Sequence, residues 1–401
     1  MKLTVAILVI TRIIAQLVIS PSVSVGAIAV ETTARKRLGN KSFIQKKERG
    51  VTRSIASSQE LQDLSSSMTH RKPGSLSYFK GWKHWCLLAL ESIRHDLSIN
   101  LPYPSDRVKF ENLFFRLGVA ADLGDMPSFS DPGARSGYAL EFFCRARNLA
   151  DLYFDSLNPS FSFPEYWVEA MMKTPMLGGD EQPYNMVSLG GGPGFDFVGA
   201  AMVSSFVTST SEKQPRSIKA TIFDYEEGWG DLVETMGEST ISVLQQPNMS
   251  CRWGGKCDIT KSLSDPSNSG CLKVIDSTQL WTCQYCIAEN ANLLRDSHFV
   301  FFHDLFENAR GGTIFIFTEV HPRIWPEFYK LMELHCPYMQ VGFNKNGRQM
   351  LLRKGSDQAQ TSPLISDKDK EFLKKFEDLA RFHTRKINSG WKRQKPKIRG
   401  S

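Results

Sequence analysis

The chain has 401 residues and a formal net charge of +7. With 41% hydrophobic and 23% charged residues, it has the composition of a folded globular protein, which excludes a fibrous or wholly disordered chain. A chain of this length can bury one large core, or two ordinary ones, without disulfide bonds.

The N-terminal 77 residues predict a targeting segment and a linker. Residues 1–30 contain Lys2, a long apolar run and small residues, and the first acid is Glu31. The run barely reaches membrane-spanning length, so a signal peptide, a weak anchor and an organelle presequence all fit it. Residues 31–77 are basic, contain serine and are poor in acids, and we expect them to form a disordered linker.

The middle of the chain predicts two kinds of structure. Residues 78–180 carry apolar residues at helical spacing, as in "FKGWKHWCLLALESIRHDL", and predict a helical cap region. In 181–355, short apolar runs alternate with helix-like stretches, and "NKNGR" predicts a hairpin turn with Gly347. The expected fold class is α/β: a doubly wound, seven-stranded, mainly parallel sheet with a C-terminal antiparallel β-hairpin, preceded by the helical cap.

Residues 356–401 predict one helix and a basic tail. Ser366 is the expected N-cap, and Phe372, Phe376 and Leu379 lie on one side of the helix. From residue 381 to 399 there are eight basic residues and no acid. Such a tail can bind RNA or another anionic partner, or serve only to keep the chain soluble.

The eight cysteines do not predict a metal site. Cys283 and Cys286 form a C-x-x-C pair, but a zinc site would need a second pair at similar spacing. Cys251 and Cys257 are separated by five residues, which is a poor match. We therefore interpret the C-x-x-C as two thiols in an apolar strand.

The glycine-rich stretch "VSLGGGPGFDF", at 187–197, follows the first predicted strand. A dinucleotide site would need G-x-G-x-x-G, but Phe195 stands in place of the third glycine. A phosphate-binding P-loop would need Lys-Ser or Lys-Thr after the last glycine, and there is none. The spacing therefore argues against both phosphate sites and against a nicotinamide-dependent oxidoreductase.

Gly190, Gly192 and Gly194 form G-x-G-x-G after a first strand, which resembles motif I of the class I S-adenosylmethionine-dependent methyltransferases. The resemblance covers about residues 185–354. It implies S-adenosyl-L-methionine as cofactor and methyl transfer to an acceptor, a small molecule or RNA, that the sequence does not identify. The family usually has an acid two residues before the first glycine, where this chain has Ser188.

The same resemblance implies further cofactor contacts. Asp224 ends the second predicted strand, where the family has an acid for the ribose hydroxyls, and Glu226 is the second choice. After the third strand, Asp258 would accept from the adenine amino group and Ile259 would lie against the ring. Gln284 ends the fourth strand. We expect Ser188 and the three glycines to complete the cofactor site.

Three residues are candidates for catalysis, because parallel strands bring their carboxyl ends to one edge. Tyr285 could line the methyl channel or be a core tyrosine. Glu289 could be a base, a helix cap or an ion-pair partner. His321, on a loop after strand five, is the first choice of proton acceptor because its unperturbed pKa suits that task.

Two hypotheses from different classes remain at this point. One is an active methyltransferase; the alternative is a degenerate methyltransferase fold used as a binding or assembly factor, motivated by Ser188 and the basic tail. The methyl donor is made in the cytosol and imported by organelles, so we expect a plastid or mitochondrion, or the endomembrane system. No stable transmembrane domain is expected beyond the N-terminal segment.

Overall fold

The computed structural model describes most of the chain from residue 55 onward. The described residues are 55–71, 75–123, 128–156, 183–209, 217–320, 322–336, 338–355 and 364–393. The predicted targeting segment and the end of the basic tail lie outside them. Among the helices described, none combines the length and hydropathy needed to cross a membrane.

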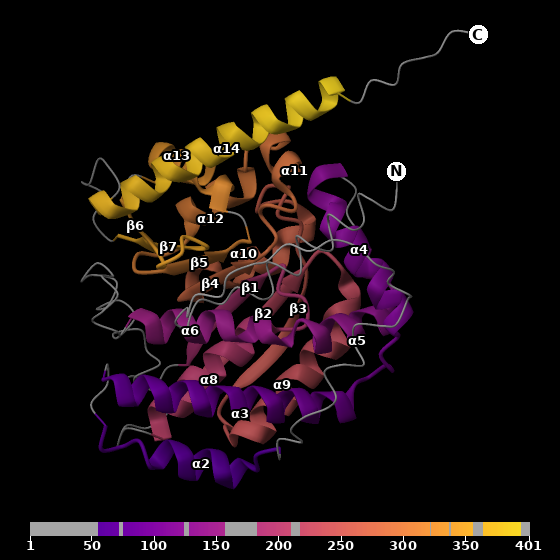
Figure 1. Ribbon diagram of the computed structural model, residues 1–401, viewed down its shortest axis with the longest axis vertical. Coiled ribbons are helices and arrows are strands. Elements are labelled where there is room, and N and C mark those ends of the chain that lie inside the picture. The colour runs from indigo at the N-terminus through magenta and orange to yellow at the C-terminus, as the bar shows by residue number, and fades with distance from the viewer. Residues whose placement is uncertain are drawn as a thin grey trace, which may run out of the picture. The chain divides into compact units, whose positions relative to one another are not determined.

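The centre of the fold is an eight-stranded sheet in the order β3-β2-β1-β4-β5-β7-β6-β8 (Figure 1). Strands β1 to β5 are parallel, β7 is antiparallel to both neighbours, and β8 is parallel to β6. The strands are β1 (Tyr184–Leu189), β2 (Ile218–Asp224), β3 (Ser250–Lys256), β4 (Leu280–Gln284), β5 (Ile314–Thr318), β6 (Met339–Phe343), β7 (Gln349–Lys354) and β8 (Leu364–Ile365).

The expected mainly parallel α/β sheet is confirmed, but the strand count of seven is wrong. The two-residue strand β8 pairs with β6 through Gln340 and Val341 and makes the eighth. Only two residues pair, which is too few to give a strand pattern in the sequence. Antiparallel β6 and β7 are joined by 344–348, where Gly347 has φ +68°.

One face of the sheet is covered by helices from the first half of the chain. They are α2 (Ser58–Ser66), α3 (Leu76–Asn100), α4 (Arg107–Leu123), α5 (Pro132–Glu141), the 3-10 helix η1 (Phe143–Ala146), α6 (Arg147–Ser156), α8 (Phe195–Ser209) and α9 (Gly230–Leu244). Met186 and Ile222 contribute strand side chains to this core, together with Trp82 and Phe206 from helices. Figure 1 shows α3 lying across α8 and α9.

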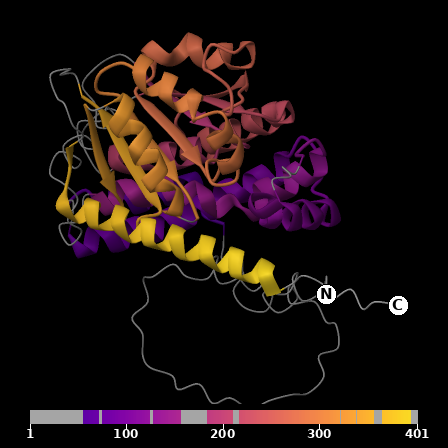
Figure 2. The same cartoon turned by 90° about the horizontal axis from the view of Figure 1, so that it is seen from above.

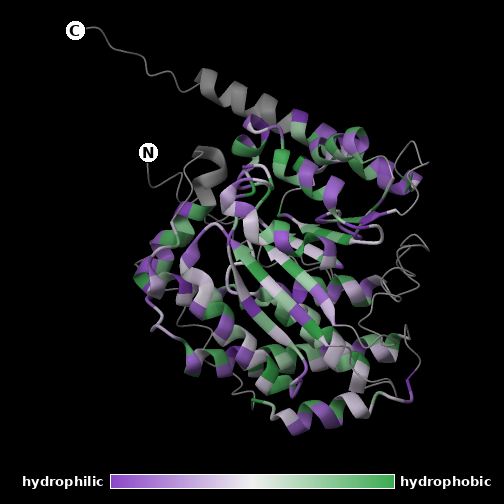
Figure 3. Ribbon diagram, turned by 180° about the vertical axis from the view of Figure 1, so that it is seen from behind, coloured by the Kyte–Doolittle hydropathy of each residue, from purple (hydrophilic) through white to green (hydrophobic). Residues whose placement is uncertain are grey.

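The other face is covered by helices from the second half. They are α10 (Ser269–Val274), α11 (Ala291–Asp296), α12 (Val300–Asn308), α13 (Trp325–His335) and α14 (Asp367–Arg393). Val187 and Phe223, the sequence neighbours of Met186 and Ile222, point into this second core, as period-two alternation requires. Figure 3 shows hydrophobic residues along the central strands, which are buried on both faces.

Helix α2 lies inside the range 31–77, where we expected a disordered linker. Its first turn has a capping box between Ser57 and Glu60, and Leu61 is buried. The Nε1 of Trp85 donates to the carbonyl of Leu61 at 3.0 Å, and Ser92 Oγ donates to the carbonyl of Ala56 at 2.8 Å. This part of the range is therefore ordered and packed on α3.

Helix α14 follows the sequence expectation at its start. Ser366 Oγ accepts from the N–H of Asp369, which is an N-cap bond, and Phe376 is buried. Phe372 stacks on Phe376, whereas Leu379 is exposed. Figure 2 shows α14, in yellow, crossing the part of the fold that carries the orange strands.

Candidate functional site

The glycine stretch lies at the topological switch point of the sheet. Strand β1 has β2 on one side and β4 on the other, and open α/β sheets bind ligands at the carboxyl ends of strands at such a point. Gly190, Gly192 and Gly194 have φ values of +57°, +47° and +95°, a region that side chains disfavour. A Cβ on Gly190 would also overlap the Sγ of Cys286.

Ser188 forms a buried hydrogen bond within the protein. It is fully buried at the end of β1, and its Oγ donates to Oδ2 of Asp196 at 2.6 Å. Asp196, in the first turn of α8, also accepts from Thr282 Oγ1 at 2.6 Å and from Gln284 Nε2. Burial raises the pKa of Asp196, while its three hydrogen bonds lower it. Ser188 is therefore the partner of a buried carboxyl beneath the loop, and its contact with the cofactor stays a prediction.

Asp224 ends β2 beside the glycine loop. Its Oδ2 accepts from the N–H of Gly192 at 2.9 Å, and its Oδ1 accepts from the N–H of Glu226 at 3.0 Å. Burial raises the pKa of Asp224 to about 6, although both hydrogen bonds oppose that shift. The half-buried carboxylate keeps further lone pairs for hydroxyl donors.

Asp258 and Ile259 lie next to Asp224 but are largely engaged within the protein. The N–H of Cys257 donates to the carbonyl of Asp224 at 2.8 Å, which places this turn beside the end of β2. Asp258 Oδ1 accepts from the N–H and Oγ1 of Thr260, and its Oδ2 lies 3.7 Å from Nζ of Lys261. Ile259 is buried in the core on the α10–α13 side.

Gln284 and Tyr285 connect the end of β4 with the helical cap. Asn148 Nδ2, from α6, donates to Gln284 Oε1 at 2.8 Å and to the Tyr285 hydroxyl at 2.7 Å. Tyr285 has φ +63°, which is strained for a bulky residue, and its N–H donates to the carbonyl of Thr318. Strain of this kind clusters at functional sites.

Arg145, from η1, supplies a cation above Tyr285. Its guanidinium carbon is 4.2 Å from the ring centroids of both Tyr285 and Phe142, and its Nη1 donates to the Tyr138 hydroxyl at 2.5 Å. Burial lowers the pKa of Arg145, but Tyr138, Tyr285 and Glu289 raise it overall. Among the described residues, Tyr138 is its one hydrogen-bond acceptor, so most of its donors remain available.

Glu289 and Glu319 are the two glutamates of the candidate site. Glu319, at the end of β5, accepts from the N–H groups of Ile287 and Ala288 and so holds the loop that carries Tyr285 and Glu289. Burial raises the pKa of Glu319 to about 8 and that of Glu289 to about 7. Within the described part of the chain, no hydrogen bond or ion pair engages the Glu289 carboxyl, unlike the cap or ion-pair role we considered.

The structure therefore brings most of the predicted residues to one edge. His321 lies outside the described residues. Asp196, Arg145 and Asn148 are additions that the sequence analysis missed. Asp196 has the sequence pattern of any acid in the first turn of a helix. Arg145 and Asn148 are more than 130 positions from Gln284 and Tyr285, so no local pattern predicts that they meet.

Neither the protein-family models nor the curated proteins include a match to this chain. Among solved structures, it is similar to an O-methyltransferase family protein from Burkholderia thailandensis, with 11% identity over 80% of this chain and 100% of that one, at a TM-score of 0.34. It is also similar to a Haemonchus contortus phosphoethanolamine N-methyltransferase in complex with phosphoethanolamine and S-adenosylhomocysteine, with 11% identity over 70% and 56%, at 0.29. A mitomycin 7-O-methyltransferase matches with 10% identity over 72% and 75%, at 0.29. At such TM-scores these similarities carry no inference about function.

Proposed function

We propose that the chain is an S-adenosylmethionine-dependent methyltransferase. The observation that carries the proposal is the bond from the N–H of Gly192 to Asp224 at the switch point. It ties a G-x-G-x-G loop to a half-buried carboxylate with spare lone pairs. A ribose offers two neighbouring hydroxyl donors, which suit such an acceptor.

The charges of the site fit this cofactor. Asp224, Glu289 and Glu319 all have raised pKa values because burial outweighs their stabilising partners. Arg145 is the cation whose field lowers the pKa of both glutamates. A ligand that carries a sulfonium cation would favour the ionised carboxylates, whereas a pyrophosphate would be repelled by them. The donor set therefore fits S-adenosylmethionine.

The bound cofactor would supply an electrophilic methyl group for in-line transfer. The glycine loop and Asp224 would hold its ribose end, and the first N–H groups of α8 can meet its carboxylate. Tyr285 would exclude water from the acceptor side. Glu289, half-buried and unpaired in the described region, would take a proton from an acceptor O–H or N–H. Glu319 would position this base by holding the loop.

The acceptor side favours a small molecule over RNA. The cap residues Tyr138, Phe142 and Arg145 gather beside Tyr285, which follows the end of β4. The free donors of Arg145 suit an acceptor with a carboxylate, phosphate or carbonyl oxygen near its nucleophile. Binding of RNA through the basic tail and import into an organelle stay predictions from the sequence.

The test is calorimetric titration of S-adenosylmethionine and S-adenosylhomocysteine into the full-length chain. The variant Asp224→Ala should lose binding, because it removes the ribose acceptor and the bond to Gly192. The matched control is Asp276→Ala, an exposed acid on the 3-10 helix η5 (Ile275–Ser277), which precedes β4 and lies near the other edge of the sheet.

Binding in the micromolar range that Asp224→Ala abolishes and Asp276→Ala leaves intact would support the proposal and justify a screen of acceptors with labelled methyl donor. A well-folded chain that binds neither ligand would overturn it. In that case the degenerate binding-factor hypothesis would be the one to pursue, by co-purification of partners.

A further inference from the structure

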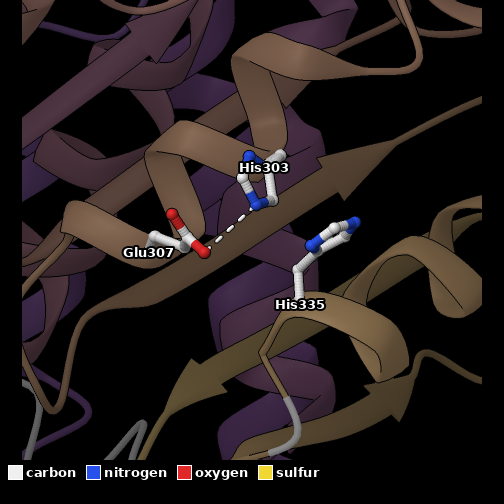
Figure 4. A group of neighbouring side chains, drawn as sticks. All are labelled: His303, Glu307 and His335. Atoms are coloured by element: carbon white, nitrogen blue, oxygen red, sulfur yellow. Dashed lines mark ion pairs between the residues drawn. The ribbon is translucent and has the colours of Figure 1, made fainter.

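A cluster of nitrogen and oxygen donors joins α12 to α13, away from the glycine loop. His303 and Glu307 lie one turn apart on α12, and His335 is the last residue of α13. The Nε2 of His303 is 3.1 Å from Oε1 of Glu307, and the two imidazole centroids are 4.0 Å apart. One donor atom from each side chain lies within 4.8 Å of the others, and Figure 4 shows the three side chains converging.

Asp304 orients the imidazole of His303. Its Oδ1 lies 3.2 Å from Nδ1 of His303, and its Oδ2 accepts from Ser262 Oγ at 2.7 Å and from the N–H of Leu263 at 3.0 Å. When a metal ion binds at Nε2, the carboxylate at Nδ1 would hold the imidazole proton on that side of the ring. Metal-binding histidines are commonly oriented by a carboxylate in this way.

His335 is available as a second imidazole ligand. In the described residues its ring takes part in no hydrogen bond, although it packs against His303.

We propose that His303, Glu307 and His335 bind a divalent transition-metal ion, Zn²⁺ by the chemistry of the donors. Two ligand atoms that are each about 2.0–2.1 Å from a tetrahedral Zn²⁺ lie roughly 3.3 Å apart, close to the separation already present between His303 and Glu307. Two imidazoles and one carboxylate suit zinc, cobalt or nickel over magnesium or calcium. Glu307 is half exposed, so the fourth position is open to water.

The site serves to tie two helices together and takes no part in methyl transfer. Helix α12 leads into β5 and α13 leads into β6, so both run antiparallel to these strands. Their C-terminal ends therefore lie at the amino edge of the sheet, opposite Asp224 and Tyr285. Metal bound at this edge stabilises the folded chain by linkage, since the unfolded chain has no assembled site.

The test titrates Co²⁺ and Zn²⁺ into the full-length, chelator-treated chain and follows visible absorption and thermal unfolding. The variants are Glu307→Gln and His335→Ala, and the controls are Glu238→Gln and His95→Ala, which change exposed residues on α9 and α3. The expected result is one equivalent bound, a Co²⁺ spectrum without a thiolate charge-transfer band, and a rise in the unfolding temperature. Loss of an outer-shell partner weakens metal binding by roughly tenfold. Each cluster variant removes a ligand and should therefore weaken metal binding by more than that.

The proposal is overturned if the folded chain binds neither ion. It is also overturned if both cluster variants bind as tightly as the controls, or if the spectrum has a thiolate band that His335→Ala leaves unchanged. A thiolate band of this kind would assign the metal to cysteines. Because no S-adenosyl ligand is present in this experiment, its outcome is independent of the proposed methyltransferase function.

Discussion

The Oγ of Ser188 donates a 2.6 Å hydrogen bond to Oδ2 of Asp196, eight residues further along the chain. Ser188 lies two residues before the first glycine of the loop, and the carboxyl group beside it comes from the first turn of α8. Through Thr282 and Gln284, the same carboxyl also bonds to β4. Gln284 in turn accepts from Asn148, which links the glycine loop to the helical cap.

Replacement of Asp196 by alanine should lower the free energy of unfolding by about 2–4 kcal/mol, since buried donors left without an acceptor cost about 1–3 kcal/mol each. Ser188, Thr282 and Gln284 would all lose their shared acceptor. Thr282 can fall back on the carbonyl of Val187 at 3.4 Å, which limits the loss. Urea unfolding at pH 8 measures this difference.

The matched variant is Asp196→Asn. Because burial raises the pKa of Asp196, the folded state disfavours its charge, and a neutral amide of the same shape should fit. Its oxygen can accept from Gln284 and its NH₂ can donate to the two hydroxyls. We expect stability within about 1 kcal/mol of the wild type, or above it. An asparagine variant as unstable as the alanine variant would show that the charge itself is needed.

Gly190 and Cys286 are a second pair whose contact can be tested. Gly190→Ala should be strongly destabilising, because its Cβ would overlap the Cys286 Sγ and its φ is +57°. Cys286→Ala should rescue part of this loss by removing the overlap, while a backbone penalty of about 1–2 kcal/mol should persist. Unfolding measurements on both single variants and the double variant give the coupling energy. Purely additive effects would contradict the contact.

The fold was largely predictable because its signals are local. The parallel strands β1, β2, β4 and β5 are short apolar runs, and each is followed by a helix-like stretch, so the doubly wound sheet could be derived from 181–355. Helix α2 could not be predicted in this way, because its nine residues lie within a basic, serine-containing stretch. Its stability comes from Trp85 and Ser92 on α3, which a local pattern does not reveal.

The residues at the ends of the strands could be predicted from the sequence, whereas the residues that the helical cap contributes could not. Asp224, Gln284 and Tyr285 follow from the rule that carboxyl ends of parallel strands meet at one edge. Arg145 and Asn148 come from the cap, and only tertiary packing brings them to β4. The bond from Ser188 to Asp196 was likewise not predictable, because it joins the end of a strand to the helix after the glycine loop.

The pKa of Asp224 predicts how cofactor affinity depends on pH. Burial raises this pKa to about 6, so the carboxylate that we propose to accept ribose hydroxyls is protonated below that value. Affinity for S-adenosylhomocysteine should be strongest at pH 7 and fall roughly tenfold by pH 5, about one pH unit below the pKa. Calorimetry across this range is the measurement. Asp224→Asn should bind weakly at every pH, and a wild-type affinity that does not change with pH would contradict the assignment.

The raised pKa values of Glu289 and Glu319 predict that the ligand-free chain loses stability as the pH rises. Both groups have a value of 4.5 before burial, and burial raises them to about 7 and about 8. Between these limits the folded state binds more protons than the unfolded state, so the free energy of unfolding falls with increasing pH. Their contribution is complete below about pH 4.5 and is lost as the pH passes 7 and then 8.

Urea unfolding from pH 6 to pH 8.5 should therefore show a decrease of up to about 4 kcal/mol, because Glu289 contributes about one pH unit and Glu319 about two, at about 1.4 kcal/mol each. Glu289→Gln removes one of the two titrations, so it should reduce this decrease and be more stable than the wild type at pH 8.5. The exposed Glu238→Gln should leave the slope unchanged. A Glu289→Gln slope equal to that of the wild type would mean that the Glu289 carboxyl is solvated, and it would remove the physical basis for treating it as a base poised near neutral pH.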